Sequence, residues 1–128
     1  MRQQNNSVLI VDDDSDVRTA LKELFETEGY NVVLAANGRA ALNRLREGLR
    51  PRVVLLDLMM PVMDGWDFRT HQQQDPALKD IPVFILTAAG FSDATIHAQF
   101  GQIPFVPKPP PHDLLLELVK NVCSLSDR

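Results

Sequence analysis

Apolar residues gather in short unbroken runs that alternate with stretches of helical periodicity. The runs VLIV (8–11), VVLL (53–56) and VFIL (83–86) are apolar at every position, which is typical of strands buried on both faces of a parallel sheet. Between such runs, segments such as 14–29 repeat apolar residues every three or four positions, a spacing that places them on one side of a helix. The pattern predicts alternating strands and helices.

The expected order is a strand followed by a helix, five times over. Strands are predicted at 8–11, 31–36, 53–56, 83–87 and 105–106, and helices at 14–29, 37–48, 66–74, 92–100 and 112 to about 123. Such alternation favours an α/β fold with a parallel sheet covered on both faces. Prolines 104 and 107 beside the last strand suit a sheet edge.

We therefore predict a flavodoxin-like, doubly wound (βα)5 fold with five parallel strands in the order 2-1-3-4-5. A single domain is expected over residues 1–128, with flexible ends at 1–6 and about 125–128.

Composition narrows the class of protein without identifying it. Hydrophobic residues make up 45% of the 128 residues, and the formal net charge is -4. This charge gives no electrostatic reason to expect nucleic acid or a membrane surface as a partner. Cys123 is the only cysteine, which fits a reducing compartment, and no apolar run is long enough to span a bilayer. We expect a cytoplasmic protein without membrane insertion and without direct nucleic-acid binding.

Charged and hydroxyl side chains follow the predicted strands, at the edge where open α/β sheets bind ligands. Asp12 and Asp13 follow the first strand and Asp57 ends the third, and these two strands are neighbours in the predicted order. Thr87 ends the fourth strand, and Lys108 follows the fifth. Crowded carboxylates repel one another unless some are protonated or a cation offsets their charge, and oxygen ligands suit Mg²⁺. A metal ion beside a carboxylate and a lysine suits phosphoryl transfer to an aspartate.

Four segments together resemble the receiver domain of bacterial two-component response regulators. They are VLIVDDD, VVLLDLMMPVMDG, VFILTA and PFVPKP, in this order, and the resemblance covers essentially the whole chain. It implies that Asp57 accepts a phosphoryl group from a histidine kinase or a phosphotransfer protein. It also implies that Thr87 and Lys108 assist this step, and that Mg²⁺ (or Mn²⁺) is the cofactor.

The resemblance assigns further roles at the same edge of the sheet. The implied metal ligands are Asp12, Asp13, Asp57 and the main-chain carbonyl of Met59. Thr87 and Phe105 are the implied switch residues. Met59 and Ala89 occupy the two positions that tune phosphoryl lifetime in the family, and neither side chain orients an attacking water. We therefore predict slow self-dephosphorylation.

The resemblance implies a signalling domain rather than a turnover enzyme. Phosphorylation is expected to change its affinity for an unidentified output protein or domain, and homodimerisation is possible through the face formed by the last strand and the helices on either side of it. Prolines 104 and 107 depart from the family pattern, and prolines 109–111 extend the stiffness of the region around the last strand. They favour the alternative, a degenerate receiver that acts as a constitutive protein-interaction module.

Each candidate residue also has an ordinary structural interpretation. Asp57 alone is compatible with a solvated loop, and Asp12 and Asp13 with a helix N-terminus that favours negative charge. Thr87 suits any strand, and Phe105 suits a core position. Two other classes fit less well. A phosphatase with an aspartate nucleophile needs a second carboxylate at position 59, which is Met. A flavin carrier needs a phosphate-cradling loop where DDDSD stands.

Two surfaces are predicted from helical periodicity. The run Gln72–Gln74 is most simply a solvated helix face. On the last helix, Leu116 falls outside the predicted core stripe and would be exposed on the output face. The stripe itself comprises Leu114, Leu115, Leu118, Val119 and Val122.

Overall fold

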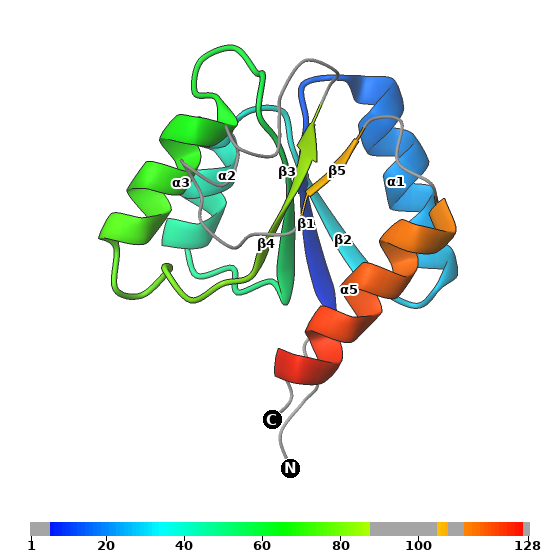
Figure 1. The fold of residues 1–128 in the computed structure, drawn as a ribbon. Helices are drawn as coiled ribbons and strands as arrows, with labels where there is room; N and C mark the ends of the chain where they lie inside the picture. Colours follow the sequence, from blue (N-terminus) through cyan, green and yellow to red (C-terminus); the bar gives the residue numbers. More distant parts are fainter. Residues whose placement is uncertain (1–5, 88–104, 108–111, 127–128) are drawn as a thin grey trace.

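The computed structural model describes residues 6–87, 105–107 and 112–126, and strands alternate with helices along them (Figure 1). The elements are β1 (Ser7–Val11), α1 (Ser15–Thr27), β2 (Asn31–Ala35), α2 (Gly38–Arg46), β3 (Val53–Asp57), α3 (Gly65–Gln74), β4 (Val83–Thr87), β5 (Phe105–Pro107) and α5 (His112–Ser126). The five strands are parallel, in the order β2-β1-β3-β4-β5. The predicted fold class and strand order are confirmed.

Helices cover both faces of the sheet, with α1 and α5 on one side and α2 and α3 on the other (Figure 1). Strand β1 shows why the run from Val8 to Val11 is apolar throughout. Leu9 and Val11 pack into the core on the α2–α3 side, whereas Val8 and Ile10 pack into the core on the α1–α5 side. All four are fully buried. Since side chains alternate between the faces of a strand, a strand covered on both faces has no polar position.

Acidic and amide side chains begin the first three helices. Asp14, Asn37 and Asp64 are the N-caps of α1, α2 and α3, and each side chain accepts hydrogen bonds from main-chain N–H groups two or three residues further on. These bonds satisfy N–H groups that have no partner within the helix. Two of the caps, Asp14 and Asp64, lie in the loops that follow β1 and β3, so capping also fixes where those loops end.

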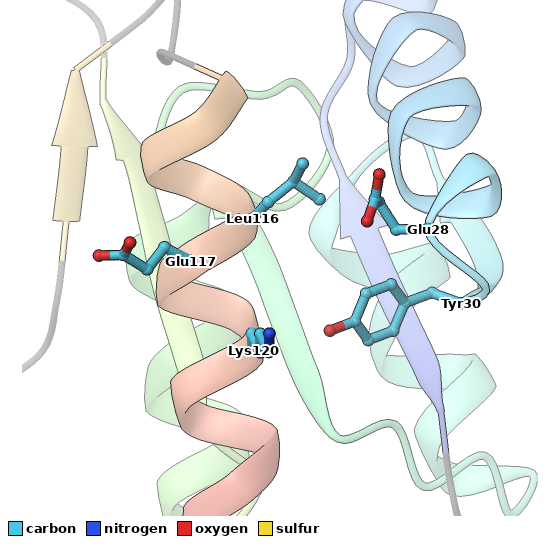
Figure 2. Close-up of a pocket in the computed structure, with 5 residues that line it drawn as sticks. All are labelled: Glu28, Tyr30, Leu116, Glu117 and Lys120. Carbon is cyan, nitrogen blue, oxygen red and sulfur yellow. The ribbon is translucent and has the colours of Figure 1, made fainter.

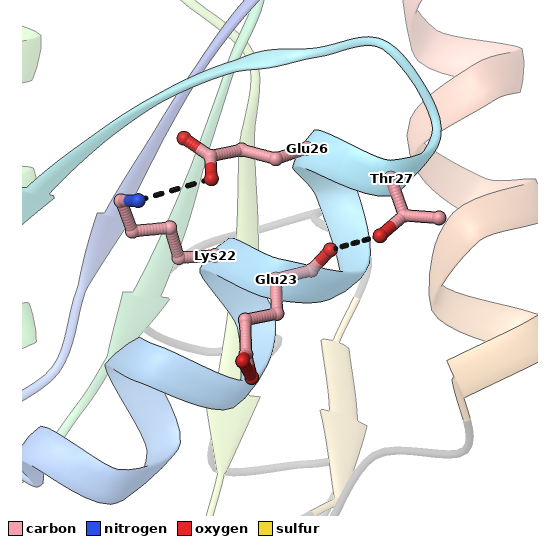
Figure 3. Close-up of polar contacts among 4 residues, drawn as sticks. All are labelled: Lys22, Glu23, Glu26 and Thr27. Carbon is pink, nitrogen blue, oxygen red and sulfur yellow. Dashed lines mark hydrogen bonds and ion pairs between the residues drawn. The ribbon is translucent and has the colours of Figure 1, made fainter.

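The outer face of α1 carries polar contacts of small energetic weight (Figure 3). Lys22 Nζ lies 3.0 Å from Glu26 Oε1, and the hydroxyl of Thr27 donates to the main-chain carbonyl of Glu23 at 2.7 Å. The side chains of the ion pair are 42% and 44% exposed. An exposed pair of this spacing contributes only about 0.3 to 0.5 kcal/mol. The packing of Leu21 and Phe25 beneath it holds the helix on the sheet.

Gln72 contradicts the predicted solvated face on α3, because its side chain is fully buried. Its Nε2 donates to the main-chain carbonyls of Leu78 at 2.9 Å and Ile81 at 3.0 Å, and its Oε1 accepts from Arg69 Nη1 at 2.8 Å. Burial lowers the pKa of Arg69. The segment between α3 and β4 folds back over the helix and turns these carbonyls toward it. The prediction was wrong for Gln72 because the two carbonyls that its Nε2 binds lie outside the helix.

Among the residues of α5 whose burial is described, Leu114 departs from the predicted core stripe; the burial of Val122 lies outside the description. Leu115 and Val119 are buried and Leu116 and Leu118 are partly buried against the core, but Leu114 is 45% exposed. With about 100° per residue, Leu114 points about 120° away from the direction midway between Leu115 and Val119. The exposed leucine is therefore Leu114 and not Leu116.

The remaining element boundaries differ from the predictions by at most a few residues, the largest difference being α5, which ends at Ser126 rather than near residue 123. The helix predicted at 92–100 and the ends 1–5 and 127–128 fall outside the described residues. Within the described residues, no helix has both the length and the apolar character that a membrane span requires.

Candidate functional site

Three carboxylates meet where β1 and β3 end. Val11 pairs with Leu56 in the sheet, so the next residues, Asp12 and Asp57, stand side by side on adjacent strands. Asp13 is the next residue after Asp12 in the chain. One carboxylate oxygen from each of the three aspartates lies within 4.8 Å of the other two. The strand register brings together the residues that the sequence predicted.

Burial makes this acidic cluster unfavourable in isolation. The side chains of Asp12 and Asp57 are 0% and 2% exposed, whereas Asp13 is exposed at the rim. Two buried carboxylates at such distances repel one another in surroundings that screen charge poorly. A cation bound among their oxygens would remove this repulsion. The donors are all oxygens and one side is open to water, which fits Mg²⁺ or Mn²⁺ better than a metal that prefers nitrogen or sulfur ligands.

Asp12 is held in place through its main chain and its side chain. Its N–H donates to the Ala35 carbonyl at 3.1 Å, and its Oδ1 accepts the N–H of Asp14 at 2.9 Å. Its carbonyl accepts a hydrogen bond from Arg18 Nη1 at 2.7 Å. Arg18 was not among the predicted site residues. Its position in the first turn of α1 was the available signal, since helical side chains lean toward the N-terminus of their helix.

Asp57 is held by the loop that follows it. The N–H of Met59 donates to Asp57 Oδ1 at 3.3 Å, and the Met59 side chain is 58% exposed beside the cluster. Gly65 N–H donates to the Leu58 carbonyl at 2.9 Å. A Cβ atom at Gly65 would lie 2.5 Å from the Asp57 carbonyl oxygen and 2.9 Å from Leu58 Cα. Only glycine permits this approach, so the start of α3 and the end of β3 are packed directly together.

For two of the other predicted residues, Thr87 and Phe105, the sheet gives the main-chain position. Thr87 ends β4, one residue beyond Leu86, which pairs with Asp57. Phe105 pairs with Ile85 on the edge strand β5, as the flanking prolines predicted. Lys108 lies outside the described residues. The roles of Thr87, Lys108 and Phe105 stay predictions.

A separate hollow lies between the end of α1 and α5 (Figure 2). Its volume is about 440 Å³, and its lining residues are Glu28, Tyr30, Leu116, Glu117 and Lys120. Helix α1 begins beside the acidic cluster and ends just before Glu28, a span of about 20 Å for 13 residues. The hollow mixes opposite charges with an apolar wall and contributes nothing to the acidic cluster.

Comparison with known proteins identifies the family. Residues 8–120 match the response regulator receiver domain. The chain belongs to this family. Receiver domains of this kind are signalling domains of two-component systems, and this is the class to which the chain is assigned.

Similar receiver domains are known in structure. The receiver domain of a signal transduction histidine kinase from Syntrophus aciditrophicus is 30% identical, with a TM-score of 0.85, and the alignment covers 96% of this chain and 93% of that one. A CheY-like response regulator receiver domain protein from Methanospirillum hungatei is 32% identical, with a TM-score of 0.80 and coverages of 93% and 94%.

Among curated relatives, the transcriptional regulatory protein CpxR of Escherichia coli is 38% identical over an alignment of 110 positions that covers 81% of this chain and 43% of CpxR. The response regulator Rre1 of Synechocystis sp. is 36% identical over 118 residues, which are 91% of this chain and 51% of Rre1. The chain thus spans about half the length of these relatives.

Proposed function

We propose that this receiver domain accepts a phosphoryl group on Asp57 from a phosphohistidine donor, a histidine kinase or a phosphotransfer protein, and that phosphorylation changes its affinity for an output protein or domain. The observation that carries the proposal is the acidic cluster of Asp12, Asp13 and Asp57, whose oxygens lie within 4.8 Å of one another. The repulsion between two adjacent buried carboxylates is relieved by protonation or by a bound cation, and a bound cation also serves phosphoryl transfer to a carboxylate.

The chemistry assigned to Asp57 is a nucleophilic displacement. One carboxylate oxygen attacks phosphorus, so that a P–O bond forms while the P–N bond to the donor imidazole breaks and its electron pair returns to nitrogen. The Met59 N–H on Oδ1 helps to orient the carboxylate for this attack. In the proposal, the Thr87 hydroxyl and the Lys108 ammonium group each bind a phosphoryl oxygen and so stabilise the product.

The proposed cation site consists of the three aspartates and the Met59 main-chain carbonyl. Mg²⁺ bound there would supply positive charge that offsets the charge on the phosphoryl oxygens. Asp12 contributes from a main chain already held by Ala35 and Arg18, and Asp57 contributes from the packed end of β3. Phosphorylation then adds a group of nearly two negative charges beside the end of β4, a local change that can bias the main chain of β4 and β5 between two arrangements.

The alternative is a degenerate receiver that binds its partners constitutively. The proline-rich region around β5 motivates it. The complete acidic cluster argues against it, because burying two adjacent carboxylates destabilises the fold without serving a constitutive interface. A cytoplasmic location, slow dephosphorylation and a homodimer through the face of the last strand and the helices predicted on either side of it remain predictions.

Intact-protein mass after incubation with acetyl phosphate tests the proposal. We expect one phosphoryl adduct with Mg²⁺, none in the presence of a chelator, and none in Asp57→Asn. Asp67→Asn, which removes an exposed carboxylate outside the cluster, is the matched control and should accept the group as the unchanged protein does. The absence of an adduct in folded protein would favour the constitutive module.

A further inference from the structure

Arg18 brings a permanent positive charge to the acidic cluster without pairing with a carboxylate. Its Nη1 donates to the main-chain carbonyl of Asp12 at 2.7 Å. Among the residues that the structure describes, Arg18 forms no ion pair. A guanidinium group carries one positive charge. Because its partner is an uncharged carbonyl, this charge is not cancelled locally and acts on the whole cluster.

The fold fixes this placement. The N–H of Arg18 bonds to the Asp14 carbonyl at 3.0 Å, and Asp14 also caps the helix. Arg18 therefore sits in the first turn of α1, and its side chain extends back toward the loop that carries Asp12 and Asp13. The contact is partly buried, so water screens the charge less than it would at a fully exposed site.

We propose that Arg18 sets the cation affinity of the cluster by keeping it low. This inference rests on the proposed metal site. In the metal-free domain the guanidinium charge reduces the repulsion among the three carboxylates. The same charge opposes a divalent cation and favours the negative phosphoryl group on Asp57. The cluster then releases Mg²⁺ readily when it carries no phosphoryl group, and Arg18 adds to the stability of the phosphorylated form.

Calorimetric titration with MgCl₂ tests the inference on the intact chain. Replacing Arg18 with Gln should tighten Mg²⁺ binding at least about four-fold, because four-fold is the effect of one charge on a divalent ion across roughly 10 Å with the full screening of water. Arg18→Met, which keeps the aliphatic stem, should tighten binding to a similar extent. Arg18→Lys keeps the charge and should bind as the unchanged protein does.

Arg44→Gln is the matched control. It removes the same charge from the last turn of α2, at the opposite end of the sheet from the cluster, and should leave the Mg²⁺ affinity unchanged. The difference in Mg²⁺ affinity between Arg18→Gln and the unchanged protein should also become smaller in high salt, where charges are screened.

The outcomes separate two failures. Unchanged protein that binds no Mg²⁺ would refute the proposed metal site itself. Unchanged protein that binds Mg²⁺, together with neutral Arg18 variants that are folded and bind it equally or more weakly, would overturn the inference alone. Weaker binding would show that Arg18 serves only to hold Asp12. Urea denaturation establishes whether each variant is folded. If Arg18→Gln is unfolded, the Mg²⁺ affinity of Arg18→Met is compared with that of the unchanged protein instead.

Discussion

Gly65 joins the end of β3 to the start of α3 so closely that one added methyl group should disturb both the fold and Asp57. In Gly65→Ala the new Cβ would lie 2.5 Å from the Asp57 carbonyl oxygen, 2.9 Å from Leu58 Cα and 3.0 Å from Leu58 Cδ2. Two of these atoms belong to the main chain of a buried strand end, so they cannot move aside as a flexible side chain would.

The size of the effect follows from two opposing contributions. Overpacking a buried site typically costs about 1 to 3 kcal/mol, and contact with main-chain atoms puts Gly65→Ala near the upper figure. Alanine favours a helix over glycine by about 1 kcal/mol at most. We therefore expect the free energy of unfolding to fall by about 2 kcal/mol. We also expect slower phosphorylation, because the displaced carbonyl belongs to Asp57 itself.

Urea denaturation followed by circular dichroism measures the stability, and intact mass against time measures the phosphorylation rate. Gly48→Ala is the matched control. Gly48 has φ +116° but no atom within 4 Å of an added Cβ, so alanine there costs about 1 to 2 kcal/mol of backbone strain without disturbing the cluster. Gly65→Ala with full stability would refute the packing argument. An equal loss of phosphorylation rate in both variants would refute the link to Asp57.

Three further changes have expected outcomes. Gln72→Leu should lower the free energy of unfolding by about 2 to 4 kcal/mol, because two buried carbonyls lose their donor. Gln73→Leu loses one exposed hydrogen bond and should lower it by less than about 0.5 kcal/mol. Urea denaturation of both variants compares the two values. Asp14→Ala should cost about 1 kcal/mol by the same method, because the cap of α1 is lost, and an unchanged midpoint would contradict its capping role. Asp13→Asn should weaken Mg²⁺ binding at least about ten-fold and slightly raise the stability of the metal-free domain. Calorimetric titration measures the Mg²⁺ affinity, and thermal melting without metal measures the stability.

The sheet and its acidic edge could be predicted because the information is local. The parts of β1 and β3 that are covered on both faces are unbroken apolar runs, so these strands are visible in the sequence, and the aspartates that follow the runs mark where the strands end. The alternation of elements predicts a doubly wound fold of five strands, and in its order 2-1-3-4-5 the first and third strands are adjacent. Asp12 and Asp57, at the ends of these strands, are then neighbours. The resemblance to receiver domains added roles for these residues but was not needed to bring them together.

What escaped prediction depends on contacts between distant segments. Gln72 is polar in a polar run, and only the path of residues 75–82 gives it buried partners. Arg18 looks like any helical arginine until the β1–α1 loop places the Asp12 carbonyl within its reach. Gly65 begins α3, and the need for glycine at this position arises from a close approach to β3 that no local pattern encodes.

The most direct test of the central claim is to locate the phosphoryl group within the chain. Protein treated with acetyl phosphate and Mg²⁺ is reduced with borohydride, which converts an aspartyl phosphate to homoserine, and the position is read by peptide mass spectrometry. We expect homoserine at position 57 alone, and none in a sample treated with a chelator. Homoserine at position 12 or 13, or none at all in folded protein that binds Mg²⁺, would contradict the assignment of Asp57 as the phosphoacceptor.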